Sequence, residues 1–184
     1  MEKNRESRIT IISILLIICL WVFNAYSATF SEYEVKAAFI YNFTRFVEWP
    51  TNSFESTNSP IVIGILGKDP FGKILENVIK DETVKNRKLE LKRYSKIEDI
   101  TSNCHILFIS KSEESKLPQI LKYLEGKDVL TVGDFEGFAV GGGIIRLLTY
   151  EDKVKLRINL ATAKRTNMVI SSQILRAAEI IDEK

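Results

Sequence analysis

The chain has 184 residues, 45% of them hydrophobic, and its 26 basic and 24 acidic side chains give a formal net charge of +2. This length indicates one domain, or one domain with a targeting segment. A net charge so close to zero provides no basic excess to attract nucleic acid, so the composition argues against nucleic-acid binding.

The first 28 residues have the pattern of a secretory signal peptide. Three basic residues precede an uncharged apolar run at positions 11–23, and small residues follow at Ala25, Ser27 and Ala28. This order of segments predicts export and cleavage, which leaves residues 29–184 as a single domain in the periplasm. The apolar run is shorter than the roughly 20 residues that a bilayer span needs. The alternative is an uncleaved N-terminal anchor.

Cysteine and histidine are sparse. Cys19 falls inside the predicted signal peptide, so the mature chain keeps only Cys104 and has no internal disulfide. Cys104 begins the apolar run 104–109 and is interpreted as a small core residue. His105 points to the opposite face of the same predicted strand, so the two form no Cys–His dyad. No spacing typical of a metal site is present in the sequence.

The mature chain opens with a predicted amphipathic helix from about Ser31 to Val47. Its apolar face is carried by residues at helical spacing, which are Val35, Phe39, Phe43 and Phe46. Ser31 with Glu34 three residues later is a capping-box pattern. Pro50 ends the helix, since the residue before a proline avoids helical angles. The polar stretch 51–60 is then expected to be a surface loop.

Short apolar runs alternate with helical spacing over the next 80 residues. The expected strands are 61–66, 89–94, 104–109 and 129–132, and the expected helices are 71–80 and 118–125. Nearly continuous apolar runs are typical of strands buried on both faces. The order of the elements therefore predicts a largely parallel α/β sheet flanked by helices.

The C-terminal part has a different pattern. Two alternating runs, 143–150 and 153–160, flank Glu151-Asp152 and predict an antiparallel hairpin with one face in water, on which Asn159 lies. Ser171 is expected to cap a closing helix whose apolar face continues through Ile174, Ala178 and Ile181. The fold class expected is thus α/β, with a mixed, largely parallel sheet, a C-terminal antiparallel hairpin and a closing helix.

Two glycine-rich segments are candidate ligand sites. The stretch 64–72 joins a strand to a helix, where a helix N-terminus can bind an anion, although its spacing matches no nucleotide motif. The alternative there is a tight turn. The run 141–143 leads into a strand, and close backbone packing or a bulge explains it more simply than a phosphate cradle.

The segment 134–138 is a candidate protein-binding loop. It places Phe135 and Phe138 beside Asp134, Glu136 and a glycine. Loops usually expose their side chains, and exposed aromatic residues anchor many protein interfaces. The alternative is that one or both phenylalanines fold back onto the core.

Several motifs in this order resemble the YfiR/HmsC family of exported bacterial proteins. The resemblance runs from about residue 33 to residue 181 and is carried by five segments, which are Lys36-Ala37-Ala38-Phe39-Ile40-Tyr41-Asn42-Phe43-Thr44-Arg45-Phe46-Val47-Glu48-Trp49-Pro50, Asp69-Pro70-Phe71-Gly72, residues 129–138 with Gly142-Gly143-Ile144-Ile145, Arg157-Ile158-Asn159-Leu160, and Ile170-Ser171-Ser172-Gln173-Ile174-Leu175.

The resemblance implies a periplasmic α/β domain, often dimeric, without known enzymatic activity. Its best understood member represses a membrane-anchored diguanylate cyclase by binding the periplasmic region of that enzyme. Release raises cyclic di-GMP, which promotes exopolysaccharide production and biofilm. Paired cysteines are implicated in redox control of that member, whereas Cys104 is the only cysteine of the mature chain here.

The sequence therefore favours a binding protein with no catalytic, cofactor-binding or metal-binding residues. The expected partner is the periplasmic region of a membrane-bound GGDEF-type cyclase or another receptor, and the expected assembly is a homodimer. The candidate contact residues are Asp134, Phe135 and Phe138, followed by Asp69, Pro70 and Phe71. The alternative function is binding of a small molecule, without a cyclase partner, above residues 64–72.

Overall fold

The computed structural model describes residues 31–182, so the predicted signal peptide lies outside the described residues. The helices are α2 (Glu32–Phe46), α3 (Lys73–Ile79), α4 (Leu117–Tyr123), α5 (Leu160–Ala163) and α6 (Ser172–Arg176). The strands are β1 (Val47–Glu48), β2 (Ile61–Leu66), β3 (Thr83–Val84), β4 (Arg87–Tyr94), β5 (Cys104–Ile109), β6 (Leu130–Gly133), β7 (Ile145–Tyr150), β8 (Lys153–Asn159), β9 (Val169–Ile170) and β10 (Ala178–Ile181).

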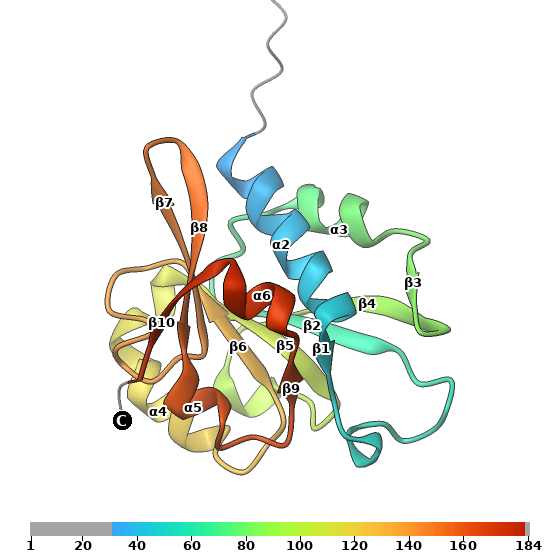
Figure 1. The fold of residues 1–184 in the computed structure, drawn as a ribbon. Helices are drawn as coiled ribbons and strands as arrows, with labels where there is room; N and C mark the ends of the chain where they lie inside the picture. Colours follow the sequence, from blue (N-terminus) through green and yellow to red (C-terminus); the bar gives the residue numbers. More distant parts are fainter. Residues whose placement is uncertain (1–30, 183–184) are drawn as a thin grey trace, which may run out of the picture. The chain divides into compact units, whose positions relative to one another are not determined.

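Eight of these strands form one mixed sheet in the order β10-β8-β7-β6-β5-β2-β4-β3, and β1 pairs with β9 in a separate antiparallel pair (Figure 1). The contiguous strands β4, β2, β5, β6 and β7 run parallel to one another. β7 and β8 form the predicted antiparallel hairpin. Its turn residues Glu151 and Asp152 both have positive φ, as a two-residue turn that follows the twist of the strands requires. The predicted fold class is confirmed.

Side chains alternate along the central strands between two hydrophobic cores. Ile106 and Phe108 of β5 face the core under α2, α3, α5 and α6, whereas Cys104, Leu107 and Ile109 face the core under α4. The fold is thus three layers deep, with helices on both faces of the sheet (Figure 1). This arrangement explains why the central strands are nearly all apolar.

Helix α2 begins as predicted, but the face that it buries is rotated about the helix axis relative to the predicted one. Ser31 caps it, and the capping box with Glu34 is present. The buried residues are Lys36, Ala37, Ile40, Phe43 and Thr44, whereas Val35 is half-buried and Ala38 is exposed. The predicted face is confirmed for Phe43, with Phe39 and Phe46 packed against the core beside it, and was wrong at Val35, because Lys36 and Ala37 take the buried positions of the first turns.

The closing helix is shorter than predicted. Ser171 does cap it, with its hydroxyl accepting a hydrogen bond from the Gln173 amide. The helix ends at Arg176, and the chain continues as β10, which adds to β8 in parallel. The apolar residues Ala178 and Ile181 therefore belong to a strand at the edge of the sheet, because an open edge beside β8 offers backbone hydrogen bonds that a longer helix would leave unmade.

Candidate functional site at the carboxyl edge of the sheet

Two of the predicted contact segments follow parallel strands at the same edge of the sheet. Asp69 comes after β2 and Asp134 comes directly after β6, so both lie at the carboxyl edge. The N-terminus of α2 and the turn of the β7–β8 hairpin reach the same edge, at the top of Figure 1. Carboxyl edges of open α/β sheets are the usual location of binding sites.

A buried ion pair joins α2 to the end of β6. The Lys36 ammonium lies 2.7 Å from Asp134 Oδ2, and the two side chains are 3% and 8% exposed. The Tyr33 hydroxyl donates to the same oxygen at 3.1 Å. Burial, followed by the charge of Asp134, raises the pKa of Tyr33 to about 12. Asp134 is therefore held as an internal carboxylate and does not present a free charge to a partner.

The hairpin is tied to the same cluster through Glu32. Lys36 also pairs with Glu32 one helical turn away, and this hydrogen bond is the largest cause of the lowered pKa of Glu32. The Thr149 hydroxyl of β7 donates to Glu32 Oε1 at 2.8 Å. The start of α2, the end of β6 and the hairpin are thus joined by polar contacts at this edge.

Asp69 closes its own turn. Its Oδ1 accepts hydrogen bonds from the amides of Phe71 at 2.7 Å and Gly72 at 3.2 Å, and its Oδ2 accepts from Arg93 Nε at 2.8 Å. These amides lie directly before the first residue of α3. The carboxylate of Asp69 already occupies these two amides, which supports the tight-turn interpretation of residues 64–72.

The three candidate phenylalanines are core residues. Phe71, Phe135 and Phe138 are 2%, 3% and 0% exposed. The expectation that Phe135 and Phe138 are exposed in a loop was wrong, and the alternative that they fold back onto the core is confirmed. Their rings pack edge to face at a centroid distance of 5.2 Å. They cannot contact a partner unless the 134–143 loop leaves the core.

Glycines make room for Phe138. A Cβ atom on Gly133 or Gly143 would lie 2.4 Å or 2.2 Å from the Phe138 ring. Gly143 thus permits close packing, as the sequence indicated for the run 141–143, and not a phosphate cradle.

The structure brings some of the predicted residues together and separates others. Phe71 packs edge-on against Tyr33 at 5.4 Å, so the Asp69–Phe71 turn meets the cluster around Asp134. Phe135 and Phe138 lie in the core on the other face of the sheet. Pro70 is half-buried and remains accessible beside Asp69. Sequence reasoning missed Tyr33 and Lys36, although a lysine at helical spacing from Ala37, Ile40 and Phe43 was a signal that its charge is buried.

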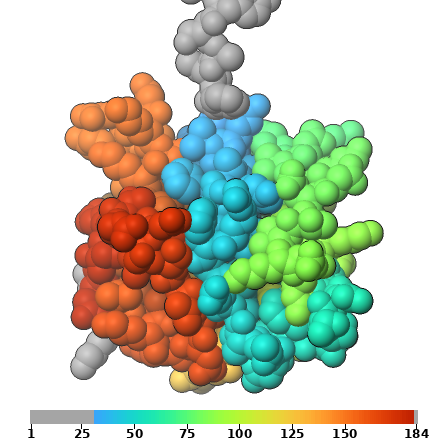
Figure 2. Space-filling model, turned by 45° about the vertical axis from the view of Figure 1, so that its right-hand side comes forward, coloured from blue at the N-terminus to red at the C-terminus, as the bar shows by residue number. Residues whose placement is uncertain are grey.

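The hairpin turn carries the exposed aromatic residue of this edge. Tyr150 is 54% exposed, and Lys155 lies over its ring at 4.3 Å. Figure 2 shows the hairpin, in orange, standing out from the surface near the first turn of α2. An exposed tyrosine next to charged residues is a common composition at protein interfaces. Tyr150, Asp69 and Pro70 therefore define what we call the carboxyl-edge surface.

Cys104 and His105 lie on opposite faces of β5, as predicted. Cys104 is 3% exposed, and burial raises the pKa of its thiol to about 12. A thiol with this pKa is a poor nucleophile. Across residues 31–182, no group of three or more His, Cys, Asp or Glu side chains is arranged to hold a metal ion.

His105 fills an irregularity between the two central strands. The register of β2 and β5 shifts at this point, with Val62 opposite Cys104 and Ile63 opposite Ile106. His105 is therefore the extra residue of a bulge. Its Nδ1 accepts a hydrogen bond from the Val62 amide at 3.0 Å, which requires a neutral ring. Burial lowers the pKa of His105 to about 4. The histidine is thus a structural core residue.

The comparisons with known proteins identify the family but not a close relative. A family model described as YfiR/HmsC-like matches residues 33–179, which is most of the chain. No curated protein matches the sequence significantly. Among the described residues, no helix combines the length and apolar character that crossing a membrane requires.

Proposed function

Because the chain belongs to the YfiR/HmsC-like family, we propose that it is a periplasmic regulator that binds the periplasmic region of a membrane-bound diguanylate cyclase and keeps that enzyme inactive. Loss of this contact raises cyclic di-GMP and promotes exopolysaccharide production and biofilm. The observation that carries the proposal is the family match over residues 33–179.

The protein acts in this proposal by binding and not by catalysis. Cys104 and His105 are both committed to the core, and neither is placed to activate a nucleophile or a water. The proposed location follows from the predicted signal peptide at residues 1–28, which export would remove.

The carboxyl-edge surface is the proposed contact with the cyclase. Tyr150 supplies exposed aromatic area at the hairpin turn, and Asp69 and Pro70 lie at the neighbouring turn after β2. The buried pair of Lys36 and Asp134 beneath them fixes the relative positions of the turn and the hairpin. Preorganised surfaces lose less conformational entropy on association, so this support favours tight binding.

A homodimer is part of the proposal. The two edge strands of the sheet, β10 and β3, leave backbone groups unpaired within the described residues, and Ile180 on β10 is 41% exposed. Edge strands pair readily with a second chain. Light scattering on the purified protein should therefore give twice the chain mass, and an Ile180→Lys variant should shift the mass toward that of one chain.

The first experiment is a pull-down of the tagged protein from solubilised membranes of its own host. A GGDEF-type cyclase among the captured proteins is the expected result. Deletion of the gene should raise cellular cyclic di-GMP, and complementation should restore the original level. Capture of a different receptor, together with unchanged cyclic di-GMP after deletion, would overturn the proposal.

A matched pair of variants tests the proposed surface. Tyr150→Ala removes the exposed aromatic ring of the hairpin, and Tyr123→Ala removes a comparably exposed ring on α4, where the exposed fractions are 54% and 38%. Loss of cyclase capture in the Tyr150 variant alone supports the carboxyl-edge surface. Equal capture by both variants would place the contact elsewhere.

A further inference from the structure

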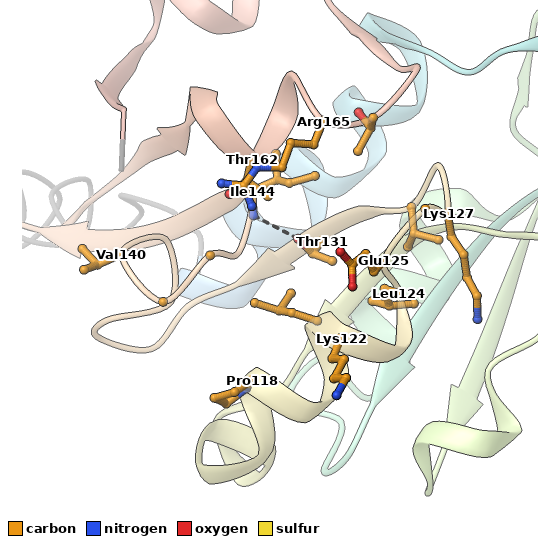
Figure 3. A pocket seen from close by; sticks show the side chains of 16 residues that line it. Pro118, Lys122, Leu124, Glu125, Lys127, Thr131, Val140, Ile144, Thr162 and Arg165 are labelled. Atoms are coloured by element: carbon orange, nitrogen blue, oxygen red, sulfur yellow. Dashed lines mark hydrogen bonds between the residues drawn. The ribbon is translucent and has the colours of Figure 1, made fainter. Parts of the chain in front are cut away.

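A pocket of about 430 Å³ opens beside the first half of β6, and the proposed function makes no use of it. Small-molecule sites are usually pockets of about 300–1,000 Å³. Figure 3 shows its three walls, which are α4 with the turn that follows it, the 134–143 loop, and α5 with the residues after it.

The pocket exists because β7 is paired with only part of β6. β7 begins at Ile145, opposite Val132, so β7 does not pair with the first residues of β6. In place of a ladder bond, the Ile144 amide donates to the Thr131 hydroxyl at 2.9 Å (Figure 3). The space beside β6 is therefore not filled by a strand, and its floor consists of apolar side chains such as Leu124, Val129 and Ile144.

Two walls of the pocket are locked together by Asn159, a residue expected on the wet face of the hairpin. Asn159 is 0% exposed. Its Nδ2 donates to the Ala139 carbonyl at 2.8 Å, and its Oδ1 accepts from the Thr162 amide at 3.0 Å. The 134–143 loop is thus fixed to the start of α5, which makes the pocket preformed.

Glycines bring the loop close to α4. Gly142 has a φ of +100°, and a Cβ atom there would lie 3.2 Å from Leu121. A Cβ atom on Gly141 would lie 3.1 Å from Leu117. These two glycines let the backbone form a smooth wall, and a larger residue at either position would reshape the pocket.

The rim of the pocket is basic. Lys122 and Lys127 lie on the α4 wall and Arg165 on the α5 wall, and Glu125 is the acidic residue among the lining side chains (Figure 3). Within residues 31–182, no carboxylate lies within 4 Å of these three cations. Lys127 instead lies over the Tyr123 ring, at 3.7 Å from its centroid. Of the three, Arg165 alone carries a guanidinium, whose planar group can make a bidentate contact with an anion across the apolar floor.

We propose that this pocket binds a small molecule that has one anionic group, held by Arg165, and an apolar body that covers Leu124, Val129 and Ile144. The proposal goes beyond the regulatory function and does not depend on it. A ligand at this place would contact the 134–143 loop, which leads directly to Asp134 at the carboxyl edge.

The test uses three probes on residues 31–184, which contain both cores and form one compact unit. Octanoate carries both features of the proposed ligand, octylamine carries the apolar body with the opposite charge, and inorganic phosphate carries only an anion. Binding is followed by the backbone amide shifts of the protein in nuclear magnetic resonance spectra. Octanoate should produce saturable shifts at Gly126, Gly141 and Gly142 and should bind at least about tenfold tighter than octylamine.

Variants assign the roles. Arg165→Gln should weaken octanoate binding by at least about tenfold, and Arg165→Lys should retain part of it. Arg176→Gln, which changes an exposed arginine on α6 outside the lining, is the matched control. The amide spectra of all variants show whether each one is folded.

The proposal is overturned by any of three results. These are octanoate shifts that do not saturate or are centred on another pocket, equal affinity for octanoate and octylamine, and unchanged octanoate affinity in folded Arg165→Gln. If phosphate alone binds as tightly as octanoate, the site recognises an anion without an apolar body, and this part of the proposal is wrong.

Discussion

The two ends of α2 are held to the sheet by different chemistry. At the carboxyl edge, the buried cation of Lys36 meets the buried carboxylate of Asp134 at 2.7 Å. At the amino edge, the chain after α2 packs on a neutral imidazole, because Phe54 stacks on His105 at 4.5 Å and Trp49 meets it edge-on at 5.7 Å. The contact at the carboxyl edge depends on a pair of opposite charges, and the contact at the amino edge depends on a histidine ring that carries no charge.

This difference predicts which change destabilises the fold at each edge. A buried ion pair fails when one partner is removed, because the remaining charge has lost both water and its counterion. A buried neutral histidine fails when it gains a proton, because its ring then needs solvation and can no longer accept the Val62 hydrogen bond. Removal of one charged partner should therefore destabilise the carboxyl edge, and acid should destabilise the amino edge.

The largest expected effect is at the carboxyl edge. Lys36→Met should lower the free energy of unfolding by about 3–5 kcal/mol, since it leaves Asp134 buried without its cation. Urea unfolding measures the change. The double variant Lys36→Met with Asp134→Leu should recover most of the loss, because no charge then remains buried.

An exposed ion pair of the same length provides the control. Lys85 and Glu48 also lie 2.7 Å apart, but their side chains are 59% and 65% exposed. Lys85→Met should leave stability unchanged within measurement, because water replaces the lost contact. A Lys36→Met variant as stable as Lys85→Met would refute the assignment of a buried, energetically coupled pair.

The next effect is the response of the amino edge to acid. The pKa of His105 is about 4 in the folded protein against 6.5 for the free side chain, chiefly because of burial. The unfolded chain therefore gains a proton at higher pH than the folded chain does. Stability should be fully present above pH 6.5 and fall as the pH drops toward 4, with a loss of about 2–3 kcal/mol from this residue.

Urea unfolding at a series of pH values measures this loss, and two variants separate its source. His105→Asn keeps an oxygen at the place of Nδ1 that can accept the Val62 hydrogen bond but does not titrate, so its stability should change less between pH 6.5 and 4. Arg176→Gln, an exposed substitution on α6, should keep the wild-type slope over this range. Identical slopes in His105→Asn and the wild type would mean that other groups cause the acid sensitivity.

The smallest effect concerns the loop that covers His105. Arg87 donates to the carbonyls of Ser56 and Ser59, at 2.9 Å and 2.7 Å, and stacks on Phe54 at 3.7 Å. Arg87→Lys should lose the planar stacking and one of these bonds, which costs about 1–2 kcal/mol. Cleavage of the 51–60 loop by protease should accelerate, whereas Arg176→Lys should leave it unchanged. Equal cleavage rates would show that Arg87 does not hold this loop.

Much of the fold could be read from local patterns. Continuous apolar runs marked the central strands, alternation marked the hairpin, and the Ser31–Glu34 pair marked the first residue of α2. The closing helix was extended too far because Ala178 and Ile181 fit a helical face as well as a strand. Helix and strand compete at such a short segment, and the open edge beside β8 decided between them.

The two candidate contact segments share one edge of the sheet, but most of the side chains that surround them there were not predicted. The Asp69 and Asp134 segments do lie at one edge of the sheet, because parallel strands end on the same side. The side chains that fill this edge were not foreseen, since Lys36 and Asp134 are 98 residues apart and their pairing depends on how α2 crosses the sheet. Phe135 and Phe138 look like loop residues in the sequence and become core residues only where Gly133 and Gly143 leave space for a ring.

The sequence by itself therefore determined the order of the central elements and the family, because these depend on residue types and their local spacing. The tertiary structure alone decided which polar groups are buried. Asn159, His105 and Lys36 each carry a side chain that local pattern assigns to water or leaves ambiguous, and each is buried. Their burial is stable only because a distant acceptor or donor meets each one, and such partners are set by packing and not by neighbours in the chain.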